Sequence, residues 1–237
     1  MDKFKINGPS KIRGEVSISG SKNAALPILA ATLLFDKNVT IKNLPRVKDI
    51  DTMLNLLKSL GKKISFKNNK KIATISKGKK NNFFAPYSLV KTMRAGILVL
   101  GPLLAKNKKA KVSSPGGCSI GVRPIDIHLK AISKLGVKIQ IEKGYVNAKA
   151  QEGLVGSEIR FSKISVGATE NSILAACLAK GTTTIKNCAI EPEIKDLTNF
   201  LKTAGAKIKW IGKRTLKIEG VKTVSYTHLT LPTIREV

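Results

Sequence analysis

The chain has 237 residues, 42% hydrophobic and 24% charged, which is typical of a folded globular protein and excludes wholesale disorder. No apolar run approaches the roughly 20 residues of a membrane span, and the N-terminal segment lacks a secretion signal, so a cytoplasmic protein without a membrane partner is predicted. The net charge is +28, but only seven of the 43 basic residues are Arg and aromatic residues make up 5%, which argues against nucleic-acid binding. Lysines spread over solvated faces explain this charge, and the same positive field would attract a small polyanionic substrate.

A repeated pattern is the clearest feature along the chain. Residues 23–64 and 170–208 both contain Ile-Leu-Ala-Ala, then Thr-Ile-Lys-Asn, then a Lys-Asp pair, and both close with Leu-Lys-x-x-Gly-x-Lys-Ile. A weaker middle copy has KTMRAGILVLGPLLA as its first helix and residues 123–139, RPIDIHLKAISKLGVKI, as its second. The closing glycines, Gly61, Gly136 and Gly205, recur at roughly 70 residues, which indicates three structural repeats.

Each repeat is predicted to contain an apolar helix, a β-branched strand, a connector with Pro and acidic residues, an amphipathic helix and another strand. The closing Gly stands where helices commonly end and where positive φ is needed. Residues 62–66 and 137–141 alternate apolar and polar side chains like half-buried strands. The first helices, ALPILAATLL and SILAACLA, are apolar on nearly all sides and are expected inside, with sheets around them. We therefore predict a pseudo-threefold α/β domain.

Three strings, SGSKNAALPILAA, SSPGGCSIGVRPIDIH and KISVGATENSILAA, resemble the UDP-N-acetylglucosamine enolpyruvyl transferases. The resemblance implies the enolpyruvyl transferase fold, an inside-out α/β barrel of three repeats, with only the first of that family's two domains complete. It implies transfer of the enolpyruvyl group of phosphoenolpyruvate to the 3-hydroxyl of UDP-N-acetylglucosamine, with release of phosphate, in the first committed step of peptidoglycan synthesis. These two small molecules are the expected partners, and neither a cofactor nor a metal is expected.

The resemblance also divides the chain into three parts. Residues 1–21 would belong to the missing second domain, and residues 22–222 would form the enolpyruvyl transferase domain. Residues 223–237 contain no Lys, do not continue the repeat and resemble translated sequencing adapter, so they are predicted to be an artefact. Because the family's catalytic base lies in the second domain, the chain alone is expected to be inactive. A noncatalytic nucleotide-sugar-binding half-domain and a shikimate-pathway relative are the alternatives.

Lys22 and Asn23 are the first candidate site residues. They lie beside the start of an apolar helix, where an ammonium, an amide and the helix N-terminus together favour an anion. A helix cap beside a solvated lysine explains the same residues. The resemblance implies that Lys22 and Asn23 hold phosphoenolpyruvate and that Lys22 also stabilises charge during the reaction.

Cys118 stands in the glycine-rich segment PGGCSIG, residues 115–121. A lone Cys in a loop is more often inert than catalytic. Here glycines permit a loop that closes over a ligand, and a thiol near Arg and Lys ionises readily and can donate a proton. The resemblance implies that Cys118 is the proton donor of the addition step and the target of fosfomycin.

The segment after the Cys loop is the next candidate. An Arg followed by a carboxylate three residues later is either a phosphate-binding fork or a surface salt bridge. The resemblance implies that five consecutive residues line the UDP-N-acetylglucosamine site: Arg123, Pro124, Ile125, Asp126 and Ile127. The following residue, His128, is expected to have a structural role rather than a catalytic one.

Two further segments complete the candidate substrate site. Arg94 is predicted on the first helix of the middle repeat, either as a helix-surface arginine or, by resemblance, as a contact to the nucleotide sugar. Lys163, Ile164, Ser165 and Val166 open the third repeat just before a helix, and the resemblance assigns them to the uridine diphosphate end.

The cysteines carry no motif of their own. Three of them, without CxxC spacing, argue against a disulfide framework and a zinc site. Cys177 and Cys188 are predicted to be small buried hydrophobic residues.

Overall fold

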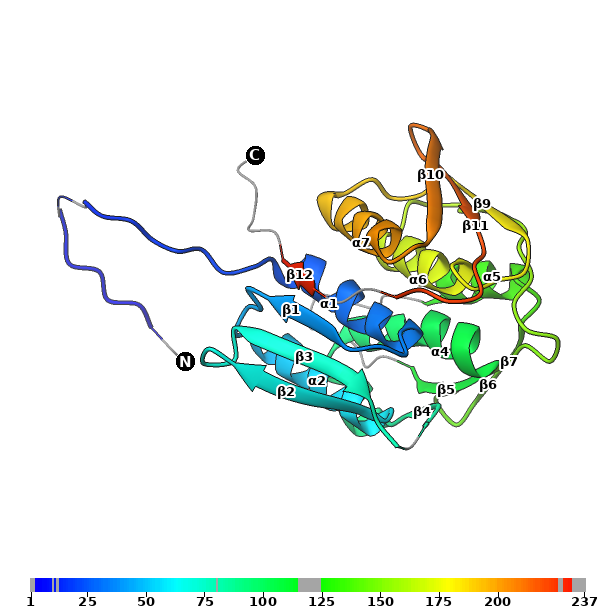
Figure 1. The fold of residues 1–237 in the computed structure, drawn as a ribbon, viewed down its shortest axis with the longest axis horizontal. Coiled ribbons are helices and arrows are strands. Elements are labelled where there is room, and N and C mark those ends of the chain that lie inside the picture. The colour runs from blue at the N-terminus through cyan, green and yellow to red at the C-terminus, as the bar shows by residue number, and fades with distance from the viewer. Residues whose placement is uncertain are drawn as a thin grey trace.

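The computed structural model describes residues 3–9, 11, 13–79, 81–114, 125–225 and 228–231. Figure 1 shows a body of helices surrounded by sheets, from which an N-terminal arm extends. The body consists of three repeats in chain order, which confirms the predicted repeat organisation.

The first repeat begins with a buried helix that Ser21 caps, its Oγ accepting a hydrogen bond from the Ala24 N–H at 3.4 Å. The second, amphipathic helix ends before Gly61, whose φ of 100° turns the chain directly into a strand. The elements are α1 (Lys22–Ala31), the 3-10 turn η1 (Thr32–Leu34), β1 (Val39–Lys42), α2 (Lys48–Ser59), β2 (Lys62–Lys67) and β3 (Ile72–Lys77).

The middle repeat departs from the prediction at its start. KTMRAGILVLGPLLA is not one helix, because a 3-10 turn precedes a short α-helix. The elements are β4 (Phe84–Ala85), α3 (Tyr87–Val90), the 3-10 turn η2 (Arg94–Val99), α4 (Leu100–Asn107), β5 (Lys109–Ser113), α5 (Asp126–Lys134), β6 (Lys138–Glu142) and β7 (Tyr145–Lys149).

The third repeat resembles the first closely. Ser165 caps its buried helix through the Ala168 N–H at 3.3 Å, as Ser21 caps α1. The elements are β8 (Glu158–Arg160), α6 (Val166–Ala176), β9 (Thr182–Lys186), α7 (Pro192–Thr203), β10 (Lys207–Gly212) and β11 (Thr215–Glu219).

The three sheets share one strand arrangement, which explains the pseudo-threefold sequence pattern. Their strand orders are β12-β1-β3-β2, β4-β5-β7-β6 and β8-β9-β11-β10. In each, the edge strand is parallel to its neighbour and the other three strands are antiparallel. The third strand of each repeat, β3, β7 or β11, was not predicted. This strand forms a hairpin with the strand before it, so each repeat contains one more strand than predicted and no further helix.

The core lies between the sheets and contains the first helices. In α1 the residues from Ala24 to Ala31 are all buried, and in α6 those from Ala168 to Ala176 are all buried. Helix α4 packs against α6, and η2 contacts both α1 and α6. These helices fill the interior, as predicted, because most of their side chains are apolar, and the amphipathic helices lie beside them.

The two ends of the described chain differ in their contacts. In the arm the apolar side chains of Phe4, Ile6, Val16 and Ile18 are exposed. Near the other end, β12 (His228–Thr230) pairs with β1 in parallel, at the sheet position that β4 and β8 occupy in the other repeats.

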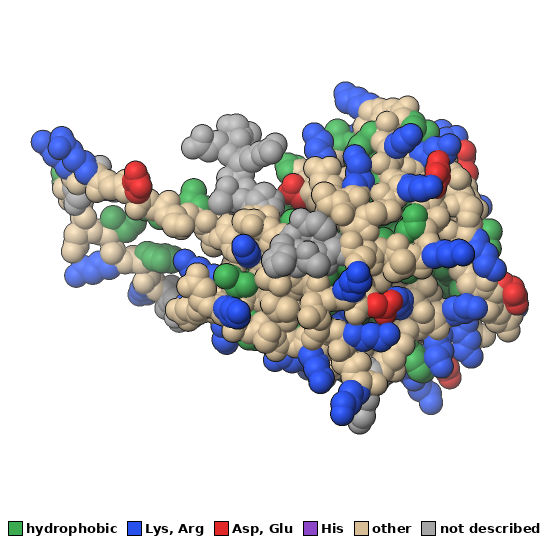
Figure 2. Space-filling view, viewed as in Figure 1, with side chains coloured by type: hydrophobic (Ala, Val, Ile, Leu, Met, Phe, Trp, Pro, Cys, Tyr) green, Lys and Arg blue, Asp and Glu red, His purple; other side chains and the backbone are tan. Residues whose placement is uncertain are grey.

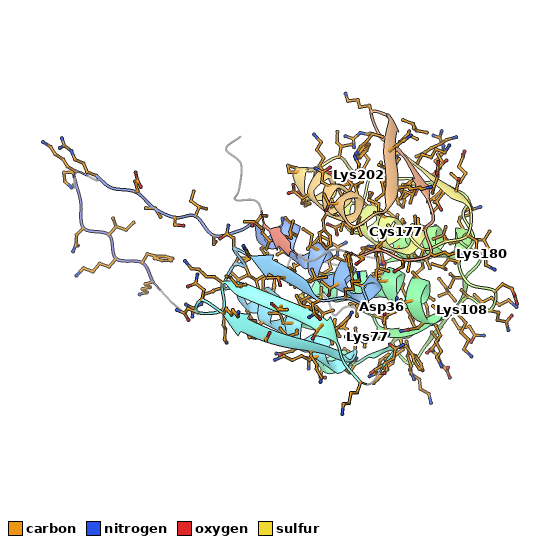
Figure 3. The ribbon with its side chains drawn as sticks, viewed as in Figure 1. Asp36, Lys77, Lys108, Cys177, Lys180 and Lys202 are labelled. Atoms are coloured by element: carbon orange, nitrogen blue, oxygen red, sulfur yellow. The ribbon has the colours of Figure 1, made fainter. Side chains whose placement is uncertain are left out.

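Basic side chains are scattered over the surface rather than gathered in one area. Figure 2 shows Lys and Arg over all parts of the visible face, including the arm. Several acidic side chains are each held by a neighbouring lysine, as Asp36 is by Lys77 and Lys106. Figure 3 shows Asp36 and Lys77 close together.

Candidate active site

A cavity of about 590 Å³ opens where the first segments of the three repeats meet. α1, η2 and α6 each contribute to its wall, together with the N-terminal turn of α2. The sequence-predicted residues that line it are Lys22, Asn23, Arg94, Ile164, Ser165 and Val166. Residues from all three repeats, up to about 140 positions apart in the sequence, therefore share one site.

Lys22 is the first residue of α1, directly after the Ser21 cap. Its Nζ lies 3.0 Å from Oδ2 of Asp49 on α2, and both side chains are partly exposed. An exposed ion pair of this kind contributes about 1 kcal/mol or less to stability. The Lys22 ammonium is therefore held at the cavity wall at little energetic cost, where an anionic ligand can compete with Asp49.

The start of α6 forms another part of the wall. Ser165 caps the helix, and its side chain accepts a hydrogen bond from the N–H of Ala168. Ile164, Val166 and Gly167 line the cavity. The N-terminus of this 11-residue helix is a region of positive electrostatic potential. Lys163 lies two residues before the cap and does not line the cavity.

Arg94 reaches the cavity from a 3-10 turn. It is the first residue of η2, not part of a continuous helix as predicted. The physical reason is the Gly101-Pro102 pair in α4, since proline provides no N–H for a helical hydrogen bond and glycine weakens a helix.

Part of the predicted nucleotide-sugar segment lies elsewhere. Ile125 precedes α5, and Asp126 is the first residue of that helix and pairs with Lys130 at 3.8 Å. Ile127 lines a separate cavity of about 670 Å³ beside Phe161. The described residues of this segment therefore do not line the first cavity.

Three predicted site residues, Cys118, Arg123 and Pro124, lie outside the described residues. Their predicted roles remain predictions.

Sequence reasoning missed three acidic residues of the cavity wall. They are Asp49, Glu170 and Glu193. Burial, and then the nearby Glu193 and Glu191, raise the pKa of Glu170 to about 8, so its carboxyl is mainly protonated at neutral pH. The string TEN in the third repeat contained Glu170, but a single acidic residue between apolar segments gives no sign that it faces a cavity.

His128 also lines the cavity, and it is buried on α5. Burial, followed by the nearby Arg94, lowers the pKa of His128 to about 4. The imidazole is therefore neutral near pH 7, with one ring nitrogen protonated and the other able to accept a hydrogen bond.

Cys177 and Cys188 are both buried, as predicted. Burial raises the pKa of Cys177 to about 12 and that of Cys188 to about 11, which makes these thiols poor nucleophiles. Among the residues that the structure describes, no helix is long and apolar enough to cross a membrane.

Comparison with known protein sequences identifies the family of the chain. The family model for EPSP synthase (3-phosphoshikimate 1-carboxyvinyltransferase) matches residues 6–232. A UDP-N-acetylglucosamine 1-carboxyvinyltransferase of Pelagibacter ubique is 64% identical over 224 residues, which are 94% of this chain and 53% of that protein. The protein of the same name from Psychrobacter sp. is 52% identical over 226 residues, with 94% and 52% covered. The chain thus spans about half the length of the curated relatives it matches.

Solved structures show the same fold. The enolpyruvyl transferase NikO from Streptomyces tendae superimposes with a TM-score of 0.79 at 22% identity, covering 95% of this chain and 53% of that one. An EPSP synthase from Acinetobacter baumannii gives 0.75 at 19% identity, covering 93% and 50%. The predicted fold and the predicted relationship to carboxyvinyltransferases are confirmed, and the chain belongs to the EPSP synthase family.

Proposed function

We propose that this chain forms one side of the active site of an enzyme that transfers the enolpyruvyl group of phosphoenolpyruvate to the 3-hydroxyl of UDP-N-acetylglucosamine. One observation carries the proposal: Lys22, Asn23 and Arg94 meet the capped start of α6 in one cavity. Ammonium, guanidinium and a helix N-terminus suit ligands that carry phosphoryl groups. The relatives named for this reaction are 51–64% identical.

Lys22 and Asn23 would hold the phosphate and carboxylate of phosphoenolpyruvate. The sugar 3-hydroxyl would then lose its proton to a base from the second domain and attack C2 while Cys118 delivers a proton to the methylene carbon C3, which gives a tetrahedral adduct. Phosphate would leave from C2 as C3 returns a proton to a base, which restores the double bond on the new ether. Lys22 neutralises the phosphoryl charge throughout.

UDP-N-acetylglucosamine would bind against the part of the cavity wall that the middle and third repeats form. Arg94 and Ile164 to Val166 lie at that wall. Ile125 to Ile127 and Lys163 would contact the ligand from outside the cavity. Arg123 and Pro124 would also bind this ligand. The neutral state of Glu170 supports this arrangement, because a buried carboxylate beside a diphosphate would repel it.

A second domain would supply the rest of the active site. Four apolar side chains of the arm are exposed, in two pairs: Phe4 with Ile6, and Val16 with Ile18. The members of each pair are two residues apart, a spacing that puts them on one face of a strand packed on another domain. We accordingly assign residues 1–21 to that domain. The chain alone should bind ligand without turnover, which is also what a noncatalytic nucleotide-sugar-binding half-domain would do.

Calorimetric titration of the purified chain with UDP-N-acetylglucosamine tests the site. Arg94→Gln should weaken binding roughly 10- to 100-fold, because a charge-assisted hydrogen bond contributes about 1.5–3 kcal/mol. The control is Arg46→Gln, since Arg46 is exposed and lies outside the cavity. Equal affinities for the two variants, or absence of binding by a folded wild-type chain, would contradict the proposal.

Phosphoenolpyruvate gives a second, matched comparison. Lys22→Gln and Lys77→Gln each break a surface ion pair of 3.0 Å, but only Lys22 lines the cavity. Lys22→Gln should abolish phosphoenolpyruvate binding and Lys77→Gln should leave it unchanged. A shikimate-pathway enzyme would instead bind 3-phosphoshikimate, which this chain should not.

A further inference from the structure

The side chain of Asn171 occupies the place of a missing helical hydrogen bond. In a continuous α-helix the Gly101 N–H would donate to the Ile97 carbonyl, four residues earlier. Here the Gly101 N–H donates to Oδ1 of Asn171 at 2.7 Å, and Nδ2 of Asn171 donates to the Ile97 carbonyl at 3.0 Å. The amide of a residue on α6 thus bridges the break between η2 and α4.

The surroundings of this bridge leave no room for another arrangement. Asn171 is fully buried, and a Cβ placed on Gly101 would lie 2.4 Å from the Asn171 carbonyl oxygen and 2.6 Å from its Oδ1. Gly101 is therefore required for the close approach of α4 and α6. The two backbone bonds also fix the orientation of the amide, because only its oxygen can accept from Gly101 and only its nitrogen can donate to Ile97.

The second N–H of Asn171 determines the state of His128. Nδ2 of Asn171 lies 3.4 Å from Nδ1 of His128. Since Nδ2 is only a donor, Nδ1 must accept, and a neutral imidazole then carries its proton on Nε2. Burial keeps the imidazole neutral, and Arg94 acts in the same direction while Asp126 opposes it.

The other edge of the imidazole faces the start of α6. A Cβ placed on Gly167 would lie 3.1 Å from Cε1 and 3.4 Å from Nε2 of His128, so this edge rests against the first turn of the helix. Gly167 and Asn171 are four residues apart on α6 and hold the ring between them. His128 is only 3% exposed, and it borders the cavity.

We propose that Asn171 is a positioning residue, which bridges the Ile97–Gly101 break and fixes His128 as the Nε2–H tautomer, so that His128 donates a hydrogen bond to a phosphoryl oxygen of the bound nucleotide sugar. The part concerning the ligand rests on the proposed function. The part concerning the tautomer rests on the hydrogen bonds alone. Together they assign a binding role to a buried histidine.

Nitrogen-15 NMR of the imidazoles tests the tautomer in the full chain. The chain contains two histidines, so a His228→Gln variant identifies the signals of His128. The wild-type spectrum should show a protonated Nε2 and an unprotonated Nδ1 for His128. A proton on Nδ1, or a doubly protonated ring at pH 7, would overturn the inference without reference to any ligand.

Asn171→Asp provides the perturbation. A carboxylate still accepts from Gly101 but has no N–H for His128, so Nδ1 of His128 should become the protonated nitrogen. Affinity for UDP-N-acetylglucosamine should then fall about tenfold or more. Asn199→Asp makes the same chemical change at an exposed position of α7 and should alter neither the tautomer nor the affinity. Because a buried Asp can prevent folding, the wild-type spectrum with and without ligand is the second measurement.

Each outcome bears on one part of the inference. Ligand that shifts the His128 Nε2–H resonance supports the contact, whereas ligand that binds without shifting it overturns the contact. If a folded wild-type chain shows the Nε2–H tautomer but binds no nucleotide sugar, the ligand part and the proposed function fail together, and the positioning of His128 by Asn171 stands. An Asn171→Asp chain that folds and retains the Nε2–H tautomer would overturn that positioning.

Discussion

Replacing Glu170 with Gln should stabilise the protein at alkaline pH and change little at acidic pH. Glu170 is 5% exposed, and its pKa rises from 4.5 to about 8 on folding because the carboxyl is buried near two other acidic residues. Gln has nearly the same shape and is never charged. The variant therefore removes the cost of ionisation while keeping the packing of α6.

The size of the effect follows from proton linkage. Between pH 4.5 and about 8 the folded state holds a proton that the unfolded state has released. The stability that this carboxyl contributes is thus complete below pH 4.5 and is lost as pH rises through about 8. At about 1.4 kcal/mol per pH unit, the loss is on the order of 3–5 kcal/mol, a large share of a typical folding free energy of about 5–15 kcal/mol.

Urea unfolding at pH 5 and pH 8.5 measures this difference. Wild type and Glu170→Gln should have similar free energies of unfolding at pH 5, and the variant should be more stable by several kcal/mol at pH 8.5. Glu219→Gln is the control, because Glu219 is half-exposed beside Lys207 on the outer sheet. A Glu170→Gln difference that is the same at both pH values would refute the assigned pKa and, with it, the neutral state of the cavity wall.

Three further predictions use other sites. Gly101→Ala should destabilise the fold by about 1–3 kcal/mol in thermal or urea unfolding, because its Cβ would overlap the α6 backbone; an unchanged midpoint would contradict the close approach. Folding lowers the pKa of His128 from 6.5 to about 4, so the free energy of unfolding should fall by up to ~3 kcal/mol as pH decreases between these values. The His128→Gln variant should not show this decrease when stability is measured against pH. Iodoacetamide should label the native chain at Cys118 and spare Cys177 and Cys188, whose thiols are buried with raised pKa values; peptide mapping that finds either buried residue modified would count against the fold.

The repeats made most of the fold predictable from the sequence. Identical strings at regular spacing indicated three copies of one unit, and Gly61, Gly136 and Gly205 marked the helix ends correctly, with φ values of 100°, 83° and 94°. All-apolar helices indicated the inside of the domain. The hairpin strands were missed although they alternate, as in β11, where Leu216 and Ile218 are buried between polar residues.

The candidate site was predictable only in part. Lys22, Asn23 and residues 164–166 stand at helix starts, and helix starts are visible in the sequence as Ser caps. The Gly101-Pro102 pair that breaks the helix before α4 was present in the sequence but was not used in the prediction, and the bridge across the break was not visible because it comes from Asn171 of another repeat. Glu170 and Glu193 were missed for the same reason, since only the packing of α1, α6 and α7 brings them to the cavity.

One chimera tests the central claim most directly. Residues 1–222 of this chain are fused to the second half of the Pelagibacter ubique relative, which is 64% identical over the shared region. Phosphate release from phosphoenolpyruvate should then depend on UDP-N-acetylglucosamine and should be lost with Lys22→Gln. A folded chimera that releases no phosphate with UDP-N-acetylglucosamine, or that releases it with 3-phosphoshikimate instead, would contradict the proposed function.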